Sequence, residues 1–183
     1  MTEFEKMRSM QMYDFSDAEI LASLVHAKEL CAKLQTMALT SPRVREIMRE
    51  LIPGIPDSSV ICPPFHCDHG NGIKVGNDVF LNYDCVILDG AYVTFEDHVK
   101  VGPCCKFMTP QHPINYLERR ESKETSSPIL IGEDAWLGAN VTVCPGVRIG
   151  RRSIIAAGSV VIRDIPDDCM AAGNPAVVKK HLV

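Results

Sequence analysis

The sequence predicts a mainly β fold, a parallel β-helix, from two columns of residues that repeat every six positions. The first column is aliphatic and consists of Ile131, Leu137, Val143, Ile149, Ile155 and Val161. The second column is compact and consists of Ala135, Val141, Val147, Ser153, Ser159 and Ile165. A helix repeats at about 3.6 residues and a strand at 2, so a period of six indicates a short strand plus a turn, stacked as successive coils.

The N-terminal residues 1–56 predict a helical cap instead. Apolar side chains recur at three and four positions from Asp17 to Met37, which is typical of an amphipathic helix. Ser41 and Pro42 then provide an N-cap and a first-turn proline for a second helix. We expect this helical hairpin to cover the first coil, whose open edge would otherwise pair with other chains. The β-helix and its C-terminal tail are expected over residues 57–183.

Two irregularities interrupt the repeat. The sixfold pattern begins at Val75, slips by two residues near Val93 and resumes at Phe95. It stops altogether at about 111–128, where the chain is polar and charged, and returns at Ile131 in the earlier phase. The sequence therefore predicts an excursion loop that leaves the coil and rejoins the same face, and long loops in compact folds are often functional.

Composition excludes several classes of protein. The 183 residues carry a formal net charge of −4, which argues against nucleic acid as a partner. No apolar run is long enough for a membrane span, and the charged start lacks the apolar core of a signal peptide. We therefore expect a cytoplasmic protein, in which the eight cysteines are reduced.

His112 is the first candidate for chemistry. It precedes Pro113 at the point where the loop leaves the rigid coil, and free imidazole can take up a proton near neutral pH. An ordinary loop histidine remains the alternative. Asp68, Asp89 and Asn82 lie on the early coils and could bind a hydroxyl-rich ligand, although Asp and Asn more often form the corners of such coils.

A zinc site is a weaker hypothesis. Cys62, His66, Cys67 and His69 lie close together in the run CPPFHCDH. Neighbours on an extended segment point to opposite sides, however, so His66 and Cys67 do not easily share one ion. We expect no metal here.

The chain resembles the maltose and galactoside O-acetyltransferases of the hexapeptide-repeat family over nearly its full length. The matching runs are EKMRSMQMY, PPFHCDHGNGIKVG, FLNYDCVILD, TPQHPI, PILIGEDAWLGANVTVCPGVRIG, AAGSVVIRDIP and AAGNPA. The resemblance implies a left-handed β-helix, assembly as a homotrimer, acetyl-CoA as co-substrate and a small hydroxyl acceptor such as a sugar.

The resemblance also implies roles for single residues. His112 matches the catalytic base, and the acceptor-binding positions match Asp68, Asp89 and an N-terminal carboxylate, either Asp14 or, as a substitute, Asp17. The positions that contact coenzyme A match Asn82, Ala139, Ala157, Ile162, Arg163, Val177 and Lys180. Ala139, Ile162, Val177 and Lys180 depart from residues that are frequent in the family, so at Ala139 only the backbone N–H could donate.

The expected mechanism is direct acyl transfer. His112 removes the proton of an acceptor hydroxyl as it attacks the thioester, and the Ala139 N–H stabilises the developing oxyanion. Since the loop projects from the coil, the cleft is expected between subunits. Two alternatives stay open at this point, a β-helical scaffold without catalysis and a metal enzyme of the carbonic anhydrase type.

Overall fold

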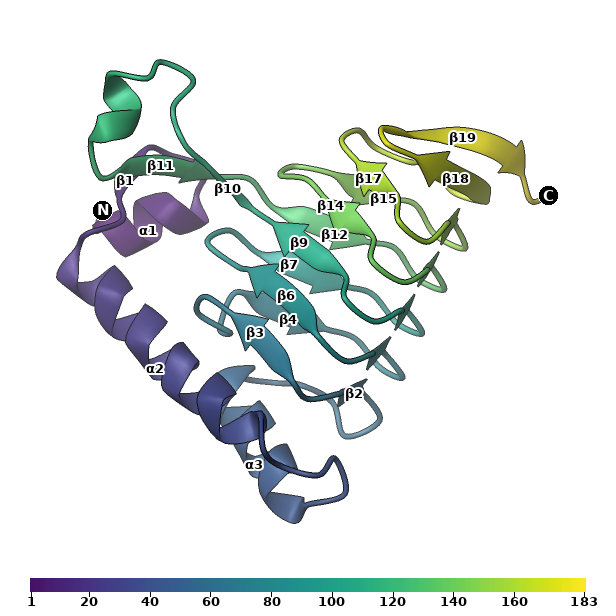
Figure 1. Ribbon diagram of the computed structural model, residues 1–183, viewed down its shortest axis with the longest axis horizontal. Helices are drawn as coiled ribbons and strands as arrows, with labels where there is room; N and C mark the ends of the chain where they lie inside the picture. The colour runs from purple at the N-terminus through teal and green to yellow at the C-terminus, as the bar shows by residue number, and fades with distance from the viewer.

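The computed structural model describes all residues 1–183 and contains a left-handed parallel β-helix, as the repeat and the resemblance predict (Figure 1). Successive coils contribute short strands to three parallel sheets, which we number in chain order. Sheet 1 contains β2 (Val60–Ile61), β5 (Phe80–Leu81), β8 (Lys100–Val101), β13 (Trp136–Leu137), β16 (Ile154–Ile155) and β18 (Cys169–Gly173), with the antiparallel β19 (Ala176–His181) at its end.

Sheets 2 and 3 complete each coil. Sheet 2 contains β3 (Phe65–Cys67), β6 (Cys85–Leu88), β9 (Lys106–Met108), β14 (Thr142–Val143) and β17 (Val160–Val161). Sheet 3 contains β4 (Ile73–Val75), β7 (Val93–Phe95), β12 (Ile129–Ile131) and β15 (Arg148–Ile149). All members of the two sixfold columns from Ile131 to Ile165 are buried, because one large and one compact side chain per six residues point into the coil.

The departures from the sixfold step all occur at one corner, between sheet 2 and sheet 3. Val143 and Ile149 face the core six residues apart, whereas Ile87 and Phe95 in an earlier coil are eight apart. The excursion loop leaves the next coil at this same corner, after β9. The phase slip near Val93 therefore reflects a corner enlarged by two residues, and we call this region the wide corner.

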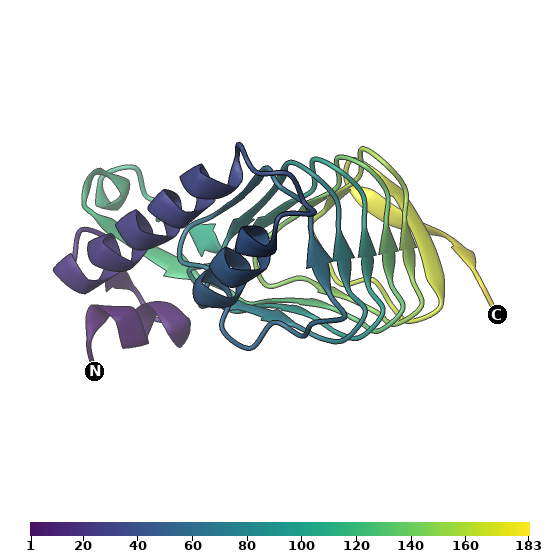
Figure 2. The same ribbon diagram turned by 90° about the horizontal axis from the view of Figure 1, so that it is seen from below.

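The N-terminal hairpin covers the first coil, as expected (Figure 2). It consists of α2 (Ala18–Leu34), capped by Asp17, and α3 (Pro42–Leu51), which starts at Pro42 as predicted. Helix α2 ends at Leu34, three residues before Met37, where the apolar pattern ends. Apolar side chains of both helices belong to the same buried core as the β-helix, so the open end of the coil is closed by helix packing.

Two N-terminal elements lie outside the prediction. Helix α1 (Glu3–Arg8) begins with a capping box between Thr2 and Glu5, and β1 (Tyr13–Asp14) follows it. β1 pairs antiparallel with β11 (Lys123–Ser126) of the excursion loop, which in turn pairs with β10 (Pro110–Gln111); η1 (Glu118–Arg120) lies between them. The excursion loop is therefore not irregular, since it forms a small sheet with the N-terminal segment above α2 (Figure 1).

Candidate active site

His112 follows β10 directly and lines a pocket of about 180 Å³. The walls come from α1, β1 and α2, from the wide corner and from β11. The lining residues are Met7, Tyr13, Phe15, Ile20, Leu21, Leu24, Asp68, His69, Gly90, Pro110, His112 and Glu124. The ring of Phe15 meets the ring of His112 edge to face, with centroids 5.9 Å apart. The lining thus combines apolar side chains with two histidines and two carboxylates.

Glu124 is a neighbour of His112 that sequence reasoning missed. Its Oε2 lies 3.7 Å from Nδ1 of His112, and its Oε1 accepts a hydrogen bond from the Tyr13 hydroxyl. The Glu124 side chain is 15% exposed, against 55% for His112. Its signal in the sequence is weak, because a single glutamate in a charged loop resembles any solvated residue.

Asp68 projects from the wide corner into the same pocket. Burial, reinforced by the negative charge of Asp89, raises the pKa of this carboxyl to about 6. The carboxyl group accepts no hydrogen bond from the chain. An ionised carboxylate that is partly buried without a donor is destabilised, and a hydroxyl group of a ligand would supply the missing donor.

Asp89 lies beneath the pocket rather than on its surface. Its side chain is fully buried, and Oδ1 accepts hydrogen bonds from the backbone N–H groups of Asp68 at 3.2 Å and His69 at 2.8 Å. Oδ2 accepts from the N–H of Gly72 at 3.0 Å. Both carboxylate oxygens are therefore used to hold the wide corner of the preceding coil, from which Asp68 projects.

His69 also belongs to the pocket wall, but as an inert group. Burial lowers the pKa of His69 to about 4, so the ring is neutral at neutral pH. Its Nδ1 lies 3.0 Å from the Ser23 hydroxyl. Phe4 packs edge to face against the same ring, with centroids 5.9 Å apart. These contacts fix His69 between α1, α2 and the wide corner.

The two N-terminal carboxylates are engaged elsewhere. Asp14 lies in β1 outside the residues that line the pocket, and it accepts hydrogen bonds from the backbone N–H and the hydroxyl of Ser16 at 2.9 and 2.6 Å. These bonds lower the pKa of Asp14. Asp17 caps α2 by accepting from the N–H of Glu19 at 2.9 Å. A role of Asp14 in acceptor binding stays a prediction.

The predicted coenzyme A residues fall into two groups at another part of the β-helix. Asn82, Ala139 and Ala157 follow β5, β13 and β16, so they stack along the corner between sheet 1 and sheet 2. The backbone N–H groups of Ala139 and Ala157 donate no hydrogen bond within the chain, whereas the Asn82 side chain accepts from the N–H of Tyr83 at 2.8 Å. We call this row the small-residue corner.

Space at the small-residue corner is limited by close stacking. A Cβ on Gly138 would lie 2.7 Å from the backbone nitrogen of Ala157, and a Cβ on Gly102 would lie 2.7 Å from that of Ala139. Small residues are therefore required where successive coils approach. They leave two backbone N–H groups without a partner in the chain, which suits an extended ligand that carries acceptor atoms.

The second group lies near the C-terminus. Ile162 and Arg163 follow β17, and Val177 and Lys180 lie on β19. All four side chains are exposed, and neither Arg163 nor Lys180 takes part in an ion pair among the salt bridges of the chain. Two unpaired cations at this end are available to an anionic ligand.

The cysteine and histidine run does not form a metal cluster. Phe65, His66 and Cys67 form β3, in which the His66 side chain is exposed while its two neighbours are buried. Cys67 instead meets Cys31 of α2, with sulfur atoms 3.8 Å apart. No group of three or more His, Cys, Asp or Glu side chains in the chain is arranged to hold a metal ion.

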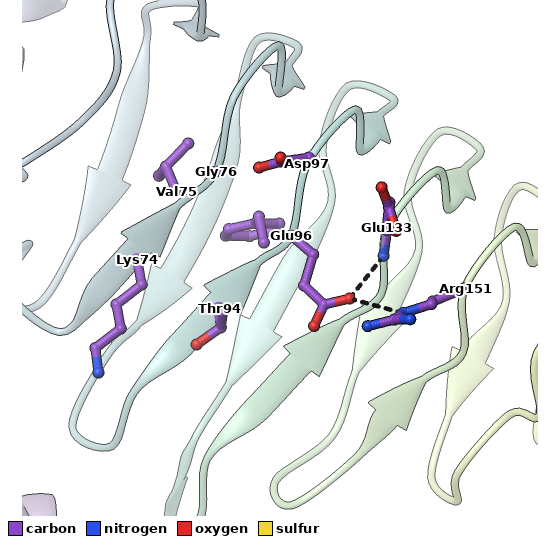
Figure 3. Close-up of a pocket in the computed structure, with 9 residues that line it drawn as sticks. Lys74, Val75, Gly76, Thr94, Glu96, Asp97, Glu133 and Arg151 are labelled. Carbon is purple, nitrogen blue, oxygen red and sulfur yellow. Dashed lines mark hydrogen bonds and ion pairs between the residues drawn. The ribbon is translucent and has the colours of Figure 1, made fainter.

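A larger pocket of about 410 Å³ lies on the outer surface of sheet 3 (Figure 3), and His112 is not among its lining residues. Its lining includes Lys74, Glu96 and Glu133, and Glu96 Oε2 lies 3.4 Å from Nε of Arg151. The same oxygen accepts from the N–H of Glu133 at 3.0 Å. This pocket holds none of the predicted site residues, and its Glu96 and Arg151 pair with each other across neighbouring coils. The pocket of about 180 Å³ that His112 and Asp68 line is therefore the candidate active site.

Comparison with known proteins identifies similar sequences. The model of the family "Bacterial transferase hexapeptide (six repeats)" matches residues 128–163. A Staphylococcus aureus protein classed among the acetyltransferases is 40% identical over 100% of this chain and 92% of its own length. None of the helices combines the length and the apolar composition that crossing a membrane requires.

Solved structures extend the likeness to three dimensions. A hexapeptide-repeat acetyltransferase from Vibrio cholerae, complexed with acetyl coenzyme A, matches with a TM-score of 0.93 and 38% identity over 100% of both chains. A maltose O-acetyltransferase from Clostridium difficile matches with a TM-score of 0.96 and 35% identity over 100% of this chain and 98% of that one. By sequence and by fold, the chain belongs to the hexapeptide-repeat acetyltransferases.

Proposed function

We propose that the protein transfers an acetyl group from acetyl-CoA to a hydroxyl of a sugar or a similar small acceptor, with His112 as general base. The observation that carries this proposal is a single pocket that both the His112 imidazole and the unpartnered carboxyl group of Asp68 line. The carboxylate accepts a hydrogen bond from one hydroxyl of the acceptor, while the imidazole accepts the proton of the hydroxyl that reacts. Maltose acetylation by a similar protein supports a sugar.

The small-residue corner fits the co-substrate. Coenzyme A is long and carries amide and phosphate groups, and the Vibrio cholerae neighbour was solved with acetyl coenzyme A. The free N–H groups of Ala139 and Ala157 would donate to the pantetheine arm or to the thioester oxygen, and Asn82 would lie at the acyl end. Ile162 and Val177 would supply apolar contacts, and Arg163 and Lys180 would face the phosphates.

The chemistry needs no covalent enzyme intermediate, because a thioester carbonyl is already electrophilic. Acetyl-CoA supplies this electrophile when bound. His112 accepts the proton as the acceptor oxygen forms its bond to the acyl carbon, and the proton later leaves with the coenzyme A thiolate. Negative charge that develops on the carbonyl oxygen is stabilised by the Ala139 N–H. Alignment of both substrates in one cleft supplies a further part of the rate enhancement.

A panel of hydroxyl acceptors, incubated with acetyl-CoA and followed by release of the free thiol, tests the proposed function. We expect release that depends on the acceptor for neutral sugars and small polyols. Mass spectrometry should show an acetyl ester, which hydroxylamine cleaves, rather than an amide. Thiol release at the same rate with and without every acceptor would contradict acetyl transfer to a hydroxyl.

The active form is predicted to be a homotrimer. Within one chain, His112 lies by the wide corner, whereas Ala139 and Ala157 lie at the corner on the other side of sheet 2. Asn82 precedes β6 and Asp89 follows it, so the width of sheet 2 lies between the two corners. The excursion loop pairs with β1 of its own chain, so it does not need a neighbouring subunit to close against. Assembly is instead expected to bring His112 of one subunit close to the small-residue corner of another.

Light scattering combined with activity across a dilution series measures this prediction. Specific activity should fall in parallel with the trimer fraction, since a monomer holds His112 and the small-residue corner too far apart to act together. Full activity in a fraction of monomeric mass, about 20.2 kDa, would contradict it.

The double substitution Arg163→Ala with Lys180→Ala is expected to raise the KM for acetyl-CoA about tenfold, while the KM for the acceptor changes little. The two cations would lose charge-assisted hydrogen bonds to phosphate, and a tenfold change corresponds to about 1.4 kcal/mol. Steady-state kinetics measures both constants. As a matched control, Lys33→Ala with Arg43→Ala removes two exposed cations from the helical hairpin, at the other end of the β-helix. Unchanged acetyl-CoA binding by calorimetry in the Arg163/Lys180 variant would show that the phosphates bind elsewhere.

A further inference from the structure

Tyr13, Glu124 and His112 form a continuous chain of polar contacts across the small sheet of the excursion loop. Tyr13 lies opposite Glu124 in the pairing of β1 with β11. Gln111, the residue before His112, lies opposite Thr125 in the pairing of β10 with β11. The carboxylate of Glu124 thus sits between two neighbouring strands, with one oxygen directed to each.

The phenol of Tyr13 holds Glu124 from one side. Tyr13 is 2% exposed, and its hydroxyl donates to Oε1 of Glu124 and lies 3.0 Å from the Ser126 hydroxyl. Burial and the charge of Glu124 raise the pKa of the phenol, so it remains a donor throughout the neutral range. A buried tyrosine hydroxyl requires a hydrogen-bond partner, and here the partners are Glu124 and Ser126.

The other oxygen of Glu124 faces the imidazole. Oε2 lies 3.7 Å from Nδ1 of His112, which is longer than a hydrogen bond. Catalytic contacts that are long in a resting enzyme often shorten when the substrate binds. A carboxylate on this side favours the tautomer with the proton on Nδ1, which leaves Nε2 free to accept a proton. It also stabilises the imidazolium that forms during the reaction.

The other groups around the ring do not serve this purpose. Phe15 packs its edge against the ring and is apolar. Asp68 and His69 line the same pocket from the wide corner, and Glu118 of η1 lines a neighbouring pocket together with His112. None of these three forms an ion pair with His112, and no lysine or arginine lines either pocket. Glu124 is therefore the one charged side chain that pairs with the His112 imidazole in the chain.

We propose that Glu124 is a positioning residue for His112, and that Tyr13 on the N-terminal segment acts through Glu124 by holding its carboxylate in place. This inference rests on the proposed function only for its kinetic consequence, since the pairing itself exists in the resting protein. It also assigns a role to the N-terminal segment, which is not needed to form the β-helix. β1 carries Tyr13, the residue that holds Glu124.

NMR titration of the His112 ring measures the pairing without any reaction. In Glu124→Gln, the pH midpoint of the His112 resonances should fall by about half to one pH unit, because the carboxylate that stabilises the imidazolium is gone. Glu121→Gln is the matched control, as Glu121 lies on the same loop but is exposed and pairs with Lys123 on the surface. It should leave the midpoint unchanged. A midpoint in Glu124→Gln that equals the wild-type value would overturn the proposal even if the enzyme proves inactive on every acceptor.

Kinetics of a double-mutant cycle test the part of Tyr13. Turnover should fall about tenfold in Glu124→Gln and severalfold in Tyr13→Phe, and the inflection of the pH–rate profile should move to lower pH in Glu124→Gln. In the Glu124→Gln background, Tyr13→Phe should have no further effect, because Tyr13 acts only through the carboxylate. Equal effects of Tyr13→Phe in both backgrounds would show a purely structural tyrosine and would overturn its assigned role.

Discussion

Turnover of the His112→Asn variant is expected to fall by roughly two to four orders of magnitude, the usual range for removal of a positioned general base. Asparagine keeps a polar side chain of similar reach but does not accept the proton. The fold, the assembly and the affinity for acetyl-CoA should be unchanged, since the His112 side chain is 55% exposed and lies outside the core. Steady-state turnover, with circular dichroism and calorimetric binding on the same samples, measures this expectation.

The pH dependence separates a general base from a residue that only shapes the loop. In the wild-type enzyme the rate should rise with pH through one ionisation, because the neutral imidazole is the competent form, and this inflection should vanish in His112→Asn. The matched control is His98→Asn. His98 is also half exposed and also lies beside a carboxylate, with Nδ1 3.6 Å from Asp78, but it occupies a different corner of the coil. Retention of more than about a tenth of wild-type turnover in His112→Asn would end the general-base assignment.

The Asp89→Asn variant is expected to lose about 2–4 kcal/mol of stability, an effect out of proportion to the change of one atom. The fully buried carboxylate accepts three backbone N–H groups, and the amide nitrogen of asparagine cannot accept, so at least one buried donor is left unpaired. Urea unfolding at a fixed protein concentration measures the loss, because assembly links stability to concentration.

Asp97→Asn provides a comparison at a neighbouring corner. The Asp97 carboxylate accepts one backbone N–H, that of Asn77 at 2.8 Å, and the contact is exposed, so we expect a loss of about 1 kcal/mol or less. The comparison also bears on the predicted acceptor role of Asp89. If Asp89 acts by contacting the acceptor and not by holding the wide corner, its variant will keep wild-type stability and will show only a raised KM for the acceptor.

The phase slip near Val93 shows which part of the candidate site the sequence predicts. Residues that keep the sixfold step form the coil, and the residues that break it fall at the wide corner, where Asp68 and Asp89 lie and where the loop with His112 departs. The break is visible in the sequence. Its meaning is not, because a slip of two residues does not say which corner of a three-sided coil it enlarges.

The position of Glu124 beside the N-terminal segment could not be predicted from the sequence. Tyr13 and Glu124 are 111 residues apart, and they meet because β1 and β11 pair antiparallel. Such pairing depends on where the excursion loop folds back, and a two-residue strand such as β1 carries no periodicity that distinguishes it from a turn. For the same reason, the sequence does not reveal that Asp14 bonds to Ser16 outside the pocket, or that Asp17 caps a helix.

The sequence by itself determined the β-helix, the helical hairpin that covers it and the place of the loop, because a six-residue period and a helical period are local properties that each segment carries alone. Only the tertiary structure decided that His112 pairs with Glu124, that Asp89 supports the wide corner from below, and that the small-residue corner lies on the other side of sheet 2. These relations join segments far apart in the chain, and they follow from how strands pair and how coils stack, which local spacing does not record.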